Sequence, residues 1–94
     1  MDISKVRFVI ADLKAELSNL KEDRQDLAEA FSLNKLVLDF LTDLEERWED
    51  SQYYGEQWRK ANDEQKRIME LAKKMDEEIK SLEHTILELE WAID

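Results

Sequence analysis

The feature that most constrains this chain is the spacing of its apolar residues, which recur in alternating steps of three and four. In an α-helix this spacing places every such residue on one face, and over many turns it forms the seam of a coiled coil. In the first half of the chain Arg24 occupies one step of the series. The apolar members of this first series are Ile3, Val6, Ile10, Leu13, Leu17, Leu20, Leu27 and Phe31.

The second half of the chain repeats the same alternation over an even longer stretch. Series of this length predict two long helices, each with one face that must be covered. The second series consists of Tyr54, Trp58, Ala61, Gln65, Ile68, Ala72, Met75, Ile79, Leu82, Ile86, Leu89 and Ile93.

Residues that break helices are almost absent. The 94 residues include no Pro and one Gly, Gly55, whereas β architectures need many more turn residues. Between the two series lie Asp50 and Ser51, both suited to cap a helix. We therefore expect one all-α domain over residues 1–94, folded as an antiparallel coiled-coil hairpin of two long helices. The first arm is expected over about 3–49, the turn over about 50–54 and the second arm over about 55–93.

The register of this hairpin follows from where the chain folds back. A turn near residue 51 brings the two series face to face, with Leu17 opposite Ile86 and Phe31 opposite Ala72. Two heptad series also coincide after each relative shift of seven residues. The spacing alone is therefore compatible with several registers.

Two other architectures are compatible with the same pattern. Ser32, followed by Asn34, could cap a new helix and divide the chain into a three-helix arrangement with a break near Ser32. One uninterrupted helix would be about 140 Å long and could bury its seam only in an elongated dimer.

Between Leu33 and Leu44 the chain carries more apolar residues than one stripe accounts for. A contact between two helices buries one stripe of each, so the surplus needs another cover. That cover is either a third packed helix, a second copy of the chain, or a helix of another protein. The turn region adds aromatic side chains, which either close the end of a thin core or provide contact area for a partner. The candidate partner-binding residues are Leu33, Leu36, Val37, Phe40, Leu41, Leu44, Trp48, Tyr53, Tyr54 and Trp58.

Charge and composition argue against several classes of function. The formal net charge is −10, and nucleic acids and anionic membranes attract the opposite sign. The longest apolar run, Phe8-Val9-Ile10-Ala11, is too short to cross a membrane. We expect neither nucleic acid binding nor membrane insertion. The first residues lack the apolar core of a signal peptide, so we expect a cytoplasmic protein, with leaderless export as the one route out of the cell.

Residues that carry chemistry are sparse. There is no Cys and one His, His84. His84 and Glu88 lie one turn apart, but a zinc site needs three or four protein ligands. We find no glycine-rich phosphate loop and no nucleophile paired with a base. The sequence therefore predicts a protein that is not an enzyme, with no catalytic residue, metal site or cofactor.

The architecture resembles the WXG family of type VII secretion, which consists of small leaderless helical hairpins with a Trp-x-Gly motif at the turn. The resemblance rests on chain length, on the central turn and on Trp48-Glu49-Asp50, followed by Tyr54 and Trp58. The third motif position is Asp50 instead of Gly, and the C-terminal Tyr- or Phe-based export signal of the family is absent. The resemblance therefore implies a divergent companion of an LXG-type toxin more than a secreted hairpin.

Together these observations favour a helical adaptor, chaperone or targeting factor that binds helices of a larger protein. Two alternatives stay open. One is a structural coiled coil that assembles with itself, in the simplest case as a homodimer, and the other is a small acidic inhibitor of phage or viral origin.

Overall fold

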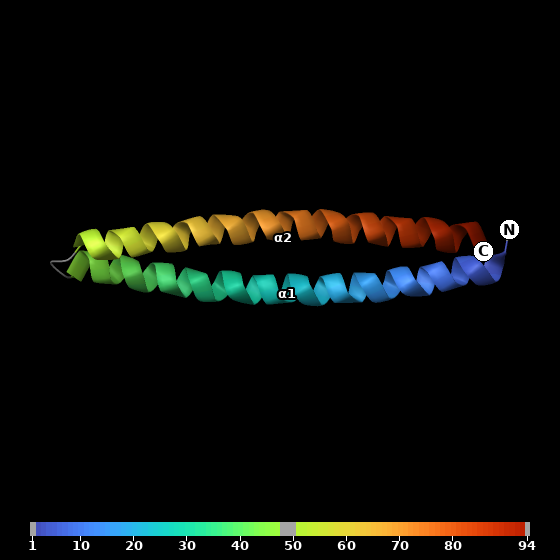
Figure 1. Cartoon of the computed structure of the whole chain (residues 1–94), viewed down its shortest axis with the longest axis horizontal. Coiled ribbons are helices and arrows are strands. Elements are labelled where there is room, and N and C mark those ends of the chain that lie inside the picture. The colour runs from blue at the N-terminus through green and yellow to red at the C-terminus, as the bar shows by residue number, and fades with distance from the viewer. Residues whose placement is uncertain (1, 48–50, 94) are drawn as a thin grey trace. The chain divides into compact units, whose positions relative to one another are not determined.

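The computed structural model describes residues 2–47 and 51–93 and contains two α-helices (Figure 1). Helix α1 spans Ile3–Arg47 and helix α2 spans Ser51–Ile93. The described residues include no strand. The predicted all-α helical hairpin is confirmed.

Helix α1 begins at Ile3 because the residue before it caps the helix. The Ser4 amide donates a hydrogen bond to the Asp2 carboxylate at 3.0 Å, and the Val6 amide donates to the Asp2 carbonyl at 3.3 Å. A side-chain oxygen in this position pairs with an amide that has no partner inside the helix.

Helix α2 begins earlier than the sequence indicates. Residues 51–54, expected in the turn, are helical from Ser51 onward. The half-buried Tyr54 starts the second apolar series, and burial of its side chain favours a helix that already includes it. Gly55 is a helical residue without a positive φ, and a Cβ there would meet the Glu45 carboxylate at an ordinary 3.4 Å. Gly55 is therefore not required by the turn.

The three-helix alternative is wrong, because α1 continues without a break through Ser32. The reason lies in the seam, which does not end at Phe31. Its steps of three and four continue through Asn34, Leu38 and Leu41, all of which are half-buried. Asn34 is thus a member of the seam and not a helix cap.

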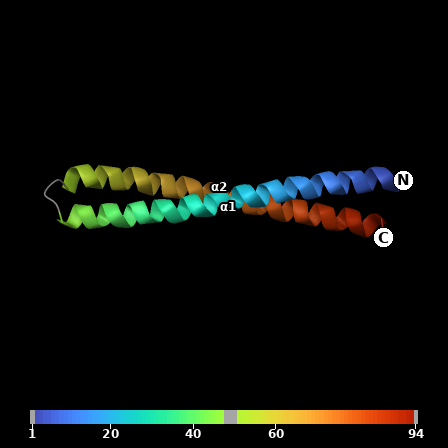
Figure 2. The ribbon, with the colours of Figure 1, turned by 90° about the horizontal axis from the view of Figure 1, so that it is seen from below.

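The packing divides into two compact units, each made of one stretch of α1 antiparallel to one stretch of α2 (Figure 2). The first unit comprises Met1–Gln25 and Lys73–Asp94, and the second comprises Asp26–Ala72. Burial is limited in both, as expected when two helices share one seam. Among the described residues, the buried apolar side chains are Ile10 and Ile86 in the first unit and Ile68 in the second.

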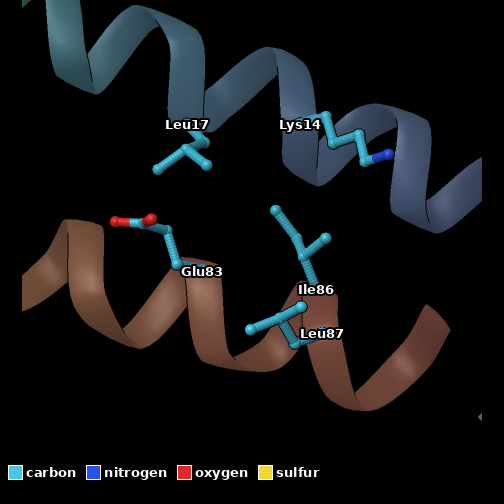
Figure 3. Close-up of a pocket in the computed structure, with 5 residues that line it drawn as sticks. All are labelled: Lys14, Leu17, Glu83, Ile86 and Leu87. Carbon is cyan, nitrogen blue, oxygen red and sulfur yellow. The ribbon is translucent and has the colours of Figure 1, made fainter. Parts of the chain in front are cut away.

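In the first unit, Leu17 and Ile86 both project into the space between the helices and line a small open hollow. Leu17 lies across from Glu83 there, and Lys14 lies across from Ile86 (Figure 3). Arg24, the polar step in the first series, forms a bidentate ion pair with Asp76, at 2.8 Å from Nε to Oδ1 and 3.5 Å from Nη2 to Oδ2. The guanidinium thus occupies a seam position without an unpaired charge.

In the second unit a polar contact crosses the seam. Asn34 Nδ2 donates to Gln65 Oε1 at 2.8 Å and to the Ala61 carbonyl at 2.8 Å. Gln65 Nε2 in turn donates to the Phe31 carbonyl at 3.4 Å. The Phe31 carbonyl therefore lies within hydrogen-bond reach of the Gln65 side chain, whereas the sequence placed Ala72 opposite Phe31.

Candidate docking surface

Four apolar side chains of α1 lie outside the seam of the second unit. Leu33, Leu36, Val37 and Phe40 form what we call the outer stripe, with exposed fractions of 65%, 65%, 48% and 63%. Their steps of three, one and three place them along one side of the helix. Since each residue turns the helix by about 100°, the outer stripe lies about a third of a turn from the seam.

The outer stripe confirms that α1 is apolar on more than one face. The contacts with other described residues leave about half or more of each of the four side chains exposed to solvent. Scattered exposed apolar residues are ordinary on protein surfaces, but a continuous stripe is a common mark of an interaction site.

Two of the candidate residues of α1 are half-buried and not exposed. Leu41 lies on the seam. Leu44 is also half-buried, one turn beyond Phe40, and borders the outer stripe. The steps of three and four place Leu41 on the seam once the first series is continued past Phe31 through Asn34, so the signal for Leu41 was present in the sequence.

The aromatic candidates near the turn are divided between the seam and the surface. Tyr54 and Trp58 are half-buried on the seam, which favours the closing of the core end over partner contact. Tyr53 is 53% exposed, and its ring packs edge-to-face against Tyr54 with centroids 5.4 Å apart. Trp48 lies outside the described residues.

Exposed apolar side chains also occur in the first unit. Leu87 and Trp91 lie one turn apart on α2 and are 65% and 87% exposed. Both residues lie off the second apolar series, a position that indicates an exposed edge. Phe8 on α1 is also exposed.

Some charged residues of the second unit are neutralised by neighbours on the same helix. Arg47 pairs with Asp43 at 3.0 Å, one turn before it on α1. On α2, Arg67 pairs with Glu64 and hydrogen-bonds to both of its carboxylate oxygens. The hydrogen bond from Arg67 lowers the pKa of Glu64, and the same contact raises the pKa of Arg67.

The described residues offer little for metal or small-molecule chemistry. No group of three or more His, Asp and Glu side chains among residues 2–47 and 51–93 could hold a metal ion. His84 Nε2 contacts Glu88 at 3.0 Å, and both side chains are largely exposed. The hollow beside Leu17 is open and measures about 220 Å³, smaller than typical ligand pockets of about 300–1,000 Å³.

Neither α1 nor α2, over the residues described, has the length of uninterrupted apolar sequence that a membrane span needs.

Comparison of the chain with protein-family models, with curated proteins and with solved structures gives no match.

Proposed function

We propose that this chain is a non-enzymatic helical adaptor, which docks the outer stripe of α1 onto a helix of a larger protein. The observation that carries the proposal is the exposure of Leu33, Leu36 and Phe40 beside a seam that α2 already occupies. Apolar side chains at this spacing match the way an amphipathic helix presents its anchors.

The energetics support a partner that contacts more than the stripe. Burying four large apolar side chains that are half to two-thirds exposed contributes on the order of 5 kcal/mol. Association costs at least about 4 kcal/mol in lost translational and rotational freedom. Stable docking therefore needs additional contacts around the stripe.

The thin core points in the same direction. Across the described residues three apolar side chains are buried, so apolar burial stabilises the hairpin only weakly. A partner that binds the folded hairpin shifts the folding equilibrium toward it. Such coupling suits a chaperone or targeting factor, which is stabilised together with the helix that it covers.

The test compares two substitutions of matched chemistry. Leu36 and Leu87 are both 65% exposed, on the outer stripe and in the first unit respectively. We expect Leu36→Asp to abolish capture of the partner from the native host, while Leu87→Asp retains it and both keep the helical circular dichroism of the parent. Equal capture by Leu36→Asp, with the captured protein identified by mass, would show that the docking face is wrongly assigned.

A self-assembling coiled coil is the alternative, because the same stripe could be covered by a second copy. Light scattering distinguishes the two. The adaptor predicts a single hairpin at micromolar concentration, whereas self-assembly predicts a larger mass that Leu36→Asp returns to that of one chain.

The particular form favoured by the resemblance to the WXG family is a companion of an LXG-type toxin in type VII secretion. The hairpin architecture supports it, while the motif residues Trp48-Glu49-Asp50 lie outside the described residues. Co-expression with the helical targeting domain of such a toxin tests this form. The expected result is a stable complex that Leu36→Asp dissociates, and separate elution of the two wild-type proteins would contradict it.

A further inference from the structure

Two carboxylates extend the face of the outer stripe at its N-terminal end. Asp26 lies seven residues, or two turns, before Leu33, and Glu29 lies seven before Leu36, so both lie on the stripe side of α1. Both are exposed, and within the described part of the chain neither forms an ion pair.

The C-terminal end of the same face is different. Arg47 lies seven residues after Phe40, but its guanidinium is held by Asp43 at 3.0 Å. The charge at this end is thus balanced within α1. The stripe is therefore asymmetric, with two uncompensated carboxylates at one end and a neutral ion pair at the other.

This asymmetry determines which helix fits. We propose, building on the adaptor function, that the occupant of the outer stripe is an amphipathic helix of another protein that carries Lys or Arg beside Asp26 and Glu29. Cations there would pair with both carboxylates, whereas acids would be repelled and neutral groups would gain nothing. The net charge of −10 adds a long-range attraction for a basic partner.

A second copy of the chain fits this face less well. Docked parallel, it would place its own Asp26 and Glu29 against the same two carboxylates. Docked antiparallel, it would place its Arg47 beside Asp26 and Glu29, but Asp43 already balances the charge of Arg47. Neither arrangement supplies an unpaired cation where the face needs one.

The length of the face sets the length of the partner helix. From Asp26 to Arg47 an α-helix rises roughly 30 Å, which corresponds to about 20 residues of the occupant. The apolar part, from Leu33 to Phe40, covers about 10 Å in the middle of that length. The partner helix thus has a short central apolar stripe and a basic end.

The experiment uses three synthetic helical peptides of about 20 residues with the same apolar stripe. At the two positions that would face Asp26 and Glu29, one peptide carries Lys, one Gln and one Glu. Binding to the full chain is measured by fluorescence anisotropy at low and at high salt. We expect the Lys peptide to bind about tenfold more tightly than the Glu peptide at low salt, with the difference reduced at high salt.

Two pairs of variants separate specific docking from general attraction. Asp26→Asn with Glu29→Gln should remove most of the preference for the Lys peptide. Asp12→Asn with Glu16→Gln makes the same charge change at exposed positions of α1 in the other unit and should leave the preference in place. Leu36→Asp should abolish binding of all three peptides.

The outcomes distinguish this inference from the adaptor function on which it rests. If all three peptides bind equally and Leu36→Asp abolishes that binding, the stripe docks helices but the basic partner is wrong. If no peptide binds, both proposals fail. If the Lys peptide binds Leu36→Asp as tightly as the parent, charge alone attracts it and the docking face is refuted. If the chain associates with itself through the stripe and excludes the peptides, a second copy is the occupant.

Discussion

Replacing the polar pair Asn34 and Gln65 tests what holds the second unit in its register. Gln65 is 8% exposed and Asn34 is half-buried, so their hydrogen bonds are largely shielded from water. Asn34→Leu removes the donor that faces Gln65 Oε1 at 2.8 Å. A buried polar group left without its partner costs about 1–3 kcal/mol, and we expect that loss in the free energy of unfolding.

The double substitution carries the more informative result. With Leu at both positions no polar group is stranded, and replacing both partners by apolar groups is nearly neutral or stabilising. We therefore expect Asn34→Leu with Gln65→Leu to be at least as stable as either single variant. The coupling energy of the double-mutant cycle should be about 1–3 kcal/mol. Urea unfolding followed by circular dichroism at 222 nm measures all four proteins.

The stable double variant should also lose its unique register. Both heptad series coincide again after a seven-residue slip, which moves the helices by about 10 Å along their axes. Spin labels at the exposed Lys35 and Lys60 report this slip by electron paramagnetic resonance. We expect one narrow distance distribution in the parent and a broadened or second population in the double variant. Single variants that cost nothing, or effects that simply add, would refute the reasoning.

Three further predictions concern single residues. Ile68→Ala should lower the free energy of unfolding by about 2 kcal/mol, since Ile68 is 5% exposed, and unchanged urea unfolding would contradict its place in the core. Phe40→Asp should change the free energy of unfolding by less than about 0.5 kcal/mol, because Phe40 is exposed, whereas Leu41→Asp should markedly lower the melting temperature, because Leu41 is half-buried on the seam. Equal melting curves for the two variants would show that seam and stripe are wrongly divided. Arg67→Gln should raise the pKa of Glu64 toward its ordinary value, because the contact with Arg67 lowers that pKa in the folded chain. The stabilising effect of this contact is present above the ordinary pKa of Glu and is lost as pH falls through the lowered pKa of Glu64. A Glu64 carboxyl titration by NMR that is the same in the variant and the parent would contradict this.

The heptad spacing predicted the hairpin because one face of each helix repeats without interruption. Every step of the second series from Tyr54 to Ile93 is buried or half-buried, and in the first series Ile3, at the start of α1, is the exposed exception. Apolar burial drives this part of the fold, and apolar burial is what the spacing of Leu and Ile reports.

The finer assignments depend on polar contacts and on geometry that spacing does not contain. Asn34 reads as a helix cap when only apolar residues are counted, although its position three after Phe31 continues the seam. The polar contacts near Phe31 are made by two side-chain amides, which carry no weight in an apolar pattern. Leu41 and Leu36 are chemically alike, but once Asn34 is counted as a seam residue the steps of three and four reach Leu41 and not Leu36.

Docking of a partner helix requires that the outer stripe is exposed in the single chain. The most direct measure of this exposure is the relaxation enhancement that a water-soluble paramagnetic agent causes in methyl groups. Methyl groups of Leu33, Leu36 and Val37 should relax strongly in the purified protein, whereas those of Ile68 and Ile86 should be protected. If the methyl groups of Leu33 and Leu36 are protected as well as that of Ile86, the stripe is already covered and no face is left for a partner helix.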